Sequence, residues 1–462
     1  MYKLNYFNFK ENDDNYLITN DVGKYMFLDK NTFRDLTSRI DLDDGIRQEL
    51  LDKGFIYDGD KEIFAINLAT KLRRAKGHLF APTVLHIFVV TKNCNFNCIY
   101  CQAGNLCQND KYMMSKETAK RAVDVALESP SKYLSFEFQG GEPLMNFEVI
   151  KYIVEYSKEV AEDKVIEYNL VSNLTLLTDE KIDFLVSNKV SICTSIDGDR
   201  LLQNKNRPYK DGDSYQVTTD MIKKLQAREI NVSAIETTTK FSLDRYKEIV
   251  DEYIALGFNN IFLRPLTRLG KADGNWDKIG YTAEEFLDFF KKSLDYIIEK
   301  NKEGIYFTEN HSSIFLKKIL LNETVNYMEL RSPCGGAIGQ LAYYYDGDIY
   351  TCDEGRMLSE MGDTSFKLGN VYENTYSSLM QCDCTKAMCV SSCLECLPYC
   401  NSCVYQPYCG TCPVINLAQD DNIFAKNPNE YRCKIYKGIL DILFDYIEND
   451  EEVVEIFKSW IM

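Results

Sequence analysis

Short apolar segments alternate with amphipathic stretches along the middle of the chain. Five stretches with apolar residues at helical spacing lie at 115–128, 147–161, 179–188, 215–227 and 243–256. Apolar segments of strand length flank them, at 84–90, 133–138, 166–171, 190–196, 232–235 and 261–263. Strands that alternate with helices are typical of a parallel sheet. The pattern predicts an α/β fold, with a partial (β/α)6 barrel of the TIM type over residues 77–290. In such barrels the chemistry lies at the carboxyl ends of the strands.

Residues 1–76 follow a different pattern. Two strand-like segments, 16–19 and 25–28, are separated by the turn signal Asn20-Asp-Val-Gly. Helical segments follow at 32–39 and 45–53, and Gly54 ends the second. The pattern predicts a small α+β module, which is too small to be catalytic by itself.

The rest of the chain divides into three parts. Residues 291–333 form a bridging segment. Residues 334–437 are rich in Cys, Gly, Tyr and Pro and poor in long periodic segments, and a loop-rich region of this kind needs metal to be stable. Residues 438–462 have helical periodicity, which predicts a C-terminal helix.

The charge balance excludes one class of partner. The chain has 53 basic and 70 acidic residues and a net charge of −17, whereas nonspecific nucleic-acid binding requires a basic surface. No apolar run approaches the ~18 residues that a membrane helix needs, and the amino terminus does not resemble a secretory signal. We therefore expect a cytoplasmic protein with no nucleic-acid or membrane partner.

The seventeen cysteines point to metal. Three lie at 94–101, ten lie between 382 and 433, and two lie at 334 and 352. A chain that is kept reduced rarely uses such groups for disulfides. The three histidines lie outside these groups, so sites made only of thiolates remain, either iron–sulfur clusters or four-cysteine zinc.

Cys94, Cys98 and Cys101 follow the first barrel strand on one short loop. Four thiolates would satisfy all four irons of a cubane cluster, whereas three leave one iron with vacant positions. A vacant position is what catalysis at a metal requires. A zinc loop with a distant fourth ligand, such as Cys107, is the alternative. Two further motifs favour the iron–sulfur cluster.

Both of those motifs end predicted strands. Gln139-Gly140-Gly141-Glu142-Pro143 follows the second strand; its glycines let the backbone approach a ligand closely, and Glu142 can accept hydrogen bonds from an ammonium group. Thr194-Ser195-Ile196-Asp197-Gly198 ends the fourth strand, and Arg207 lies further on. Ser195 and Asp197 suit ribose hydroxyls, and Arg207 suits a carboxylate.

The cysteine triplet, with the aromatic Tyr100 before its last cysteine, resembles the signature of the radical S-adenosylmethionine superfamily, and Gly140 to Pro143 resembles its companion motif. The resemblance covers residues 84–266. It implies a [4Fe–4S] cluster that binds the amino and carboxylate groups of S-adenosylmethionine. An external one-electron reductant of the flavodoxin or ferredoxin type then triggers cleavage to a 5′-deoxyadenosyl radical, which takes a hydrogen atom from a substrate.

The resemblance also assigns roles to single residues. Tyr100 lies near the adenine, and the glycine–glutamate–proline motif holds the methionine amino group. The resemblance further implies that Asn173, Ser195 and Asp197 contact the ribose of the cofactor and that Arg207 contacts its carboxylate.

The C-terminal cysteines resemble the auxiliary-cluster (SPASM) domain of radical maturases. The spacing between Cys409 and Cys412 is one residue shorter than in that family. The resemblance implies two auxiliary [4Fe–4S] clusters. One is held by Cys334, Cys352 and Cys412, and the other by Cys400, Cys403, Cys409 and Cys433.

The first auxiliary set lacks a fourth thiolate. Cys393 or Cys389 supplies it, or that iron stays open for substrate. Cys382, Cys384 and Cys396 are surplus. Four-cysteine zinc sites are the alternative for the whole region.

Stretches 134–148, 192–198 and 405–414 resemble the radical maturases of His-Xaa-Ser peptide systems. This resemblance implies an oxidoreductase-like enzyme that modifies a ribosomally made precursor peptide, by crosslinking or oxidation. It also implies that residues 1–76 are a winged-helix-like module to which the leader peptide adds a strand; a structural cap on the barrel is the alternative.

Asp353 follows the cluster ligand Cys352 directly. In the sulfatase-maturing relatives the aspartate in that place acts as a base, so Asp353 is the candidate catalytic base; a solvated turn residue is the alternative. Two other functions stay open for the chain. One is a sulfatase-type or small-molecule radical dehydrogenase, and the other is an iron–sulfur electron carrier or sensor. The open-iron triplet and the glycine–glutamate–proline motif speak against a carrier.

Overall fold

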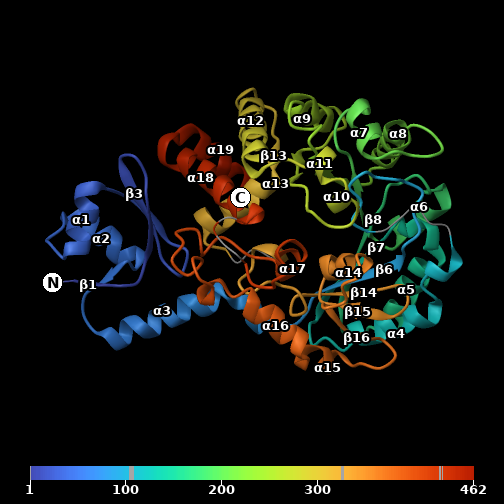
Figure 1. Cartoon of the computed structure of the whole chain (residues 1–462), viewed down its shortest axis with the longest axis horizontal. Helices are drawn as coiled ribbons and strands as arrows, with labels where there is room; N and C mark the ends of the chain where they lie inside the picture. Colours follow the sequence, from blue (N-terminus) through green and yellow to red (C-terminus); the bar gives the residue numbers. More distant parts are fainter. Residues whose placement is uncertain (1, 104–108, 324–326, 426–427, 429) are drawn as a thin grey trace.

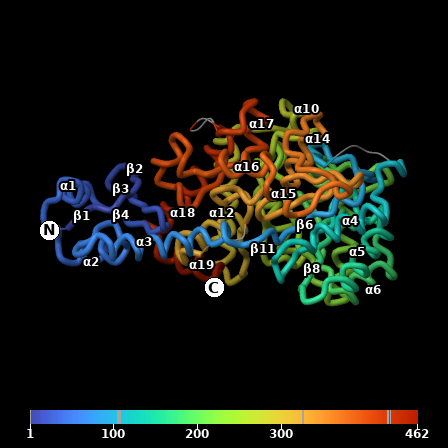
Figure 2. Tube along the Cα trace, turned by 90° about the horizontal axis from the view of Figure 1, so that it is seen from below, coloured from blue at the N-terminus to red at the C-terminus, as the bar shows by residue number. Residues whose placement is uncertain are grey.

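The computed structural model of the protein describes residues 2–103, 109–323, 327–425, 428 and 430–462. The molecule is elongated, with an N-terminal module at one end and a large sheet with its helices at the other (Figures 1 and 2). Parts of the cysteine-rich C-terminal region lie between the two. Within the described ranges, none of the helices is long and apolar enough to span a bilayer.

The large sheet contains the six predicted strands side by side and parallel. Its order over the described residues is β12–β10–β9–β8–β7–β6–β14–β15–β16. The six are β6 (Leu85–Thr91), β7 (Tyr133–Gly140), β8 (Val165–Val171), β9 (Val190–Ser195), β10 (Val232–Thr237) and β12 (Leu263–Arg264). The prediction of an α/β fold with a parallel sheet is therefore confirmed. The last predicted strand is split, because β11 (Asn260–Ile261) pairs with β13 (Thr308–Glu309) outside this sheet.

The predicted helices connect these strands. Side chains at their N-termini stabilise several of them; Ser115 and Thr178, for example, accept hydrogen bonds from the first turns that follow. The fully buried Phe88, Phe136 and Phe138 pack between sheet and helices. The helices are α4 (Lys116–Leu127), α5 (Phe147–Val160), α6 (Asp179–Ser187), α8 (Ser214–Gln226) and α9 (Tyr246–Ala255).

The cysteine-rich region is more ordered than its sequence pattern predicts. Three of its strands extend the large sheet. β14 (Gln340–Tyr343) pairs parallel with β6, and β15 (Asp348–Tyr350) and β16 (Lys367–Asn370) continue antiparallel. These strands depend on pairing with β6 and with one another, which the local sequence pattern does not report. The region also holds α14 (Asp353–Glu360), α15 (Tyr376–Gln381), α16 (Asp383–Ser391) and α17 (Pro413–Asp420).

Two boundaries differ from the sequence-based expectation. The helix α12 (Ala283–Lys302) continues across residue 290, so the expected end of the barrel falls inside a helix. The predicted C-terminal helix is two helices, α18 (Tyr431–Asn449) and α19 (Glu451–Ile461). They meet at Asp450, whose backbone is extended and whose side chain accepts a hydrogen bond from Val453 N.

The N-terminal module is a three-stranded antiparallel sheet covered by helices. Its core includes the buried Ile18, Leu28, Leu36, Leu50 and Phe55. The elements are β2 (Asn8–Glu11), β3 (Asn15–Thr19), β4 (Tyr25–Asp29), α1 (Lys30–Ser38), α2 (Asp44–Lys53) and the pair β1 (Lys3–Leu4) with β5 (Ile56–Tyr57). From there α3 (Lys61–Ala75), which has no fully buried residue, leads to the large sheet (Figure 1).

The module is docked on the cysteine-rich region and on α18. Thr19 Oγ1 donates to Val404 O at 2.6 Å, and Asn8 Nδ2 donates to Cys403 O at 3.0 Å. The Tyr25 ring lies edge-on to Phe444 of α18. These contacts fix the module beside the loop that carries the predicted second auxiliary site.

Candidate active site

Cys94, Cys98 and Cys101 lie together on the loop after β6. Burial and the neighbouring Cys98 raise the pKa of Cys94 above its usual value. Burial raises the pKa of Cys98 to about 12, and the neighbouring Cys101 adds to the effect. Thiolates bind metals, and this environment disfavours thiolates unless a cation lies beside them. The three thiols therefore fit a bound iron cluster, which supplies that positive charge.

The glycine pair lets the end of β7 lie against the cysteine loop. Gly141 N donates to Thr91 O at 2.9 Å, and Glu142 N donates to Asn93 O at 2.7 Å. A Cβ atom on Gly140 would lie 2.2 Å from Thr91 O, and one on Gly141 would lie 2.3 Å from Asn93 O. The glycines therefore admit the backbone that leads into Cys94. The close approach to a ligand expected from the sequence stays a prediction.

We expect Gly141→Ala to displace the cysteine loop, because its Cβ overlaps the carbonyl of Asn93. Overpacking of this kind costs about 1–3 kcal/mol. The variant should hold less iron than the wild type after anaerobic reconstitution. Gly77→Ala is the matched control, since a Cβ there meets nothing within 4 Å. Equal iron in the two variants would contradict this role of the glycine.

Glu142 is a buried carboxylate with three donors. It accepts from Leu144 N at 3.0 Å, from Ser172 Oγ at 2.7 Å and from Asn173 N at 2.8 Å. Burial raises the pKa of Glu142, and the hydrogen bond from Asn173 opposes that shift. Pro143 starts the short turn that follows. The sequence analysis missed Ser172, which no motif marks.

The side chain of Asn173 reaches the cysteine loop. Its Nδ2 donates to Asn95 Oδ1 at 2.8 Å, and its Oδ1 accepts from Thr175 Oγ1 at 2.7 Å. Asn173 therefore joins the end of β8 to the residue after Cys94. The ribose contact proposed for it stays a prediction.

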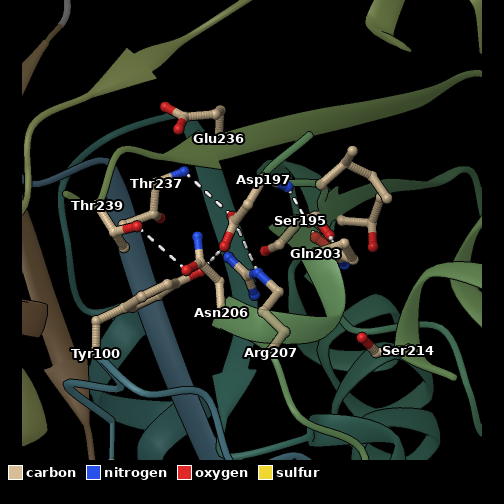
Figure 3. A network of polar contacts seen from close by, with 12 residues as sticks. Tyr100, Ser195, Asp197, Gln203, Asn206, Arg207, Ser214, Glu236, Thr237 and Thr239 are labelled. Carbon is tan, nitrogen blue, oxygen red and sulfur yellow. Dashed lines mark hydrogen bonds and ion pairs between the residues drawn. The ribbon is translucent and has the colours of Figure 1, made fainter. Parts of the chain in front are cut away.

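Tyr100, Asp197 and Arg207 bind one another (Figure 3). Tyr100 OH donates to Asp197 Oδ2 at 2.7 Å, and Arg207 Nε donates to Asp197 Oδ1 at 3.1 Å. Thr237 N donates to the same carboxylate at 3.3 Å, and Asp197 is fully buried. The structure thus brings together three predicted cofactor residues, but it pairs them with each other. Ser195 lies beside them at the end of β9.

Glu236, at the end of β10, was missed by the sequence analysis. It is fully buried; its Oε2 accepts from Thr238 Oγ1 at 2.8 Å, and its Oε1 has no partner within the described residues. Burial and the charge of Asp197 raise its pKa well above the usual value. Its place at the carboxyl end of a predicted strand is a signal that would have found it.

Cys334, Cys352 and Cys412 share one buried apolar cluster. Burial raises the pKa of Cys352 well above its usual value, and Glu354, Cys412 and Cys334 contribute. Cys412 therefore lies with Cys334 and Cys352, although the spacing between Cys409 and Cys412 is one residue shorter than in the family. Glu354, which the sequence analysis missed, is the acidic neighbour of all three thiols.

The other cysteines near this region are not members of the buried cluster. Cys393 Sγ is 3.7 Å from Cys396 Sγ, in a turn that follows α16. Cys389 lies on α16 itself, and Cys384 packs against the edge of the buried cluster. Cys107 lies outside the described residues.

Cys400, Cys403, Cys409 and Cys433 line one cavity of about 430 Å³. Burial raises the pKa of Cys409, with contributions from the other three thiols. Four thiols around one cavity fit a four-iron cluster. No three His, Cys, Asp or Glu side chains of the described segments are gathered tightly enough for a single metal ion. A four-iron cluster needs wider spacing, since each thiolate binds a different iron.

Asp353 begins α14 and forms an ion pair with Arg356, three residues further on. Arg356 is fully buried, and its Nη1 donates to Ala103 O at 3.4 Å, just after the cysteine triplet. Burial, and then the charge of Asp353, raise the pKa of Glu137 in β7. Asp353 therefore directly follows Cys352 of the first auxiliary set and acts electrostatically on Glu137 of a barrel strand. The helical spacing from Asp353 is a signal that would have found Arg356.

Residues 88–252 match the radical SAM superfamily. The uncharacterized protein MJ0907 of Methanocaldococcus jannaschii is 30% identical over 285 residues, which are 61% of this chain and 88% of that protein. The radical SAM cyclopropyl synthase TigE of Paramaledivibacter caminithermalis is 24% identical over 359 residues, which are 73% of this chain and 69% of TigE.

Solved structures show the same fold. The AdoMet-bound structure of anSMEcpe has a TM-score of 0.67 at 21% identity and covers 80% of this chain and 99% of its own. Streptococcus suis SuiB bound to the precursor peptide SuiA has a TM-score of 0.57 at 15% identity and covers 93% and 99%. The match of residues 88–252 and the 30% identity to MJ0907 over 88% of that protein show that the chain belongs to the radical SAM superfamily.

Proposed function

We propose that this radical SAM enzyme modifies a ribosomally made precursor peptide, by a crosslink or an oxidation that starts with hydrogen-atom abstraction. When bound, the cluster and S-adenosylmethionine supply the 5′-deoxyadenosyl radical. Relatives with peptide substrates support the proposal, since SuiB has been solved with its precursor peptide. The SuiB match covers 93% of this chain. The part left out is shorter than residues 1–76, so the match includes part of the N-terminal module.

The observation that carries the proposal is the placement of that module. Its sheet ends in β2 and β4, and no strand pairs with the outer edge of either within the described residues. An extended leader peptide can add a strand to such an edge. The module is also bonded to the loop of the second auxiliary set, through Asn8 and Thr19. A leader bound there is held at a fixed distance from the cluster sites.

Asp353 is the proposed base for a proton that leaves the substrate. Its ion pair with the buried Arg356 holds its carboxylate in one position, and an ionised carboxylate is the form that accepts a proton. Arg356 is then a positioning residue. Two observations support this role: Asp353 follows Cys352 directly, and its charge contributes to the raised pKa of Glu137 in β7.

Removing residues 1–75 should weaken peptide binding at least about tenfold, or ~1.4 kcal/mol, because the leader loses its docking edge. Fluorescence anisotropy with the peptide encoded beside the gene measures this. Cleavage of S-adenosylmethionine without peptide should persist, since the triplet lies elsewhere. A peptide without its leader should bind both proteins equally weakly. Unchanged affinity of the full peptide for the shortened enzyme would rule out leader recognition by the module.

Mass spectrometry of the same peptide after reaction tests the proposal itself. A mass loss of two hydrogens is expected for a crosslink or an oxidation. An unmodified peptide, beside normal formation of 5′-deoxyadenosine from active enzyme, would contradict it.

A further inference from the structure

A turn between the two auxiliary sites carries two cysteines that neither set of thiols uses. Cys393 and Cys396 form a Cys-x2-Cys motif around a 3-10 turn (Leu394–Cys396). Their sulfur atoms lie 3.7 Å apart, and both are free thiols. Cys396 is exposed to solvent, and Cys393 is half-buried. Such a pair has the spacing of reversible dithiols.

Among the described residues, Cys393 is not grouped with either auxiliary set. The buried cluster that holds Cys334, Cys352 and Cys412 does not include it. The 430 Å³ cavity is lined by its neighbour Leu394 and not by Cys393. Its sulfur contacts Glu395 Oε2, at 3.4 Å, and the sulfur of Cys396, at 3.7 Å. The placement favours a partner for Cys393 on its own turn.

Contacts from three segments hold this turn in place. Glu395 accepts from Ser332 Oγ at 2.7 Å and from Gln406 Nε2 at 2.8 Å, and it pairs with Lys76 directly after α3. Leu394 N donates to Ser332 Oγ at 2.9 Å. Because the backbone is fixed, the two thiols stay near each other. They need to approach by less than 2 Å to reach the ~2.05 Å of a disulfide bond.

We propose that Cys393 and Cys396 are a redox-active dithiol, which a disulfide-class oxidant converts to an intramolecular disulfide, and that neither is an iron ligand. The exposed Cys396 thiolate attacks one sulfur of the external disulfide and releases one thiol. The Cys393 thiolate then attacks the Cys396 sulfur of the mixed disulfide and releases the second. Two electrons pass to the oxidant, and its two product thiols take up the protons that the cysteines lose.

The modification acts where the linker from the N-terminal module meets the second auxiliary loop. Glu395, inside the motif, contacts Lys76 at the end of that linker and Gln406 on that loop. Ser332, the third contact, lies two residues before Cys334 of the first auxiliary set. Oxidation of Cys393 and Cys396 is thus a change at the place where the linker from the N-terminal module, the second auxiliary loop and the segment before Cys334 meet.

Glutathione disulfide is the probe for the test, applied without oxygen to the full-length protein with its clusters reconstituted. The protein is quenched in acid, treated with a chelator, alkylated and digested with a protease that cuts after glutamate. Cleavage after Glu395 separates the two cysteines unless they are bonded. We expect a joined peptide pair as the major form, alkylated at the other cysteines of the two peptides but at neither Cys393 nor Cys396. Separate alkylated peptides at all oxidant concentrations would overturn the proposal.

Three variants complete the test. Cys396→Ser should abolish the joined form, whereas Cys389→Ser, on the neighbouring helix, should retain it. Cys393→Ser should keep the wild-type iron content and the electron paramagnetic resonance signals of the auxiliary clusters. Loss of iron or an altered auxiliary signal in Cys393→Ser would make Cys393 a cluster ligand, and would overturn the dithiol.

Discussion

Replacing Cys94, Cys98 and Cys101 together with alanine should abolish cleavage of S-adenosylmethionine and remove about one-third of the bound iron, one four-iron cluster of three. The three thiols lie on a single loop after β6 and contribute to no other set of cysteines in the described chain. Iron analysis and the yield of 5′-deoxyadenosine measure the two effects. The variant should retain the absorbance of the auxiliary clusters.

The control is the variant in which the cysteines of the second auxiliary set are replaced instead. Replacing Cys400, Cys403, Cys409 and Cys433 empties the 430 Å³ cavity of its thiols and leaves the triplet in place. This variant should lose a similar share of iron and still form 5′-deoxyadenosine. Loss of all iron from either variant would show that the sites are not independent, and would contradict the account.

Asp197→Asn should destabilise the protein by about 3–5 kcal/mol, because removal of one partner leaves a buried charge unpaired. The charge is that of Arg207, which is 11% exposed and bonded to the fully buried Asp197. The amide keeps the shape of the site and removes its negative charge. Urea unfolding under anaerobic conditions measures the change.

The double variant Asp197→Asn/Arg207→Met should be more stable than the single one, since no charge is left unpaired. If Asp197→Asn has wild-type stability but binds S-adenosylmethionine more weakly, Asp197 contacts the cofactor, as the resemblance implies. That result would contradict a stabilising role for the pair of Asp197 and Arg207.

The parts of the fold in which apolar segments alternate regularly with amphipathic ones could be predicted from the sequence. The six parallel strands, the helices between them and two strands of the small N-terminal sheet are present as predicted. The strands β14–β16 were missed because they depend on pairing with β6 and with each other. The break at Asp450 lies within a continuous helical pattern, so only the extended backbone there reveals it.

The candidate site also has features that could be predicted from the sequence and features that could not. The resemblance grouped Cys334 with Cys352 and Cys412, and the structure brings these thiols together. The contact of Gly141 with Asn93 joins two loops about fifty residues apart, and no spacing rule reports it. The pairing of Asp197 with Tyr100 and Arg207 likewise depends on three elements meeting at one edge of the sheet. Tyr100, Asp197 and Arg207 satisfy one another in the structure, and their contacts with the cofactor stay predictions.

The most direct test of the account is the fate of S-adenosylmethionine. The protein is reconstituted with iron and sulfide without oxygen, reduced with dithionite and mixed with S-adenosylmethionine, and 5′-deoxyadenosine is measured by chromatography. We expect 5′-deoxyadenosine and methionine in equal amounts from the wild type, and none from the Cys94, Cys98 and Cys101 variant. Intact clusters without any 5′-deoxyadenosine would mean an electron carrier or sensor, and would contradict the enzyme described above.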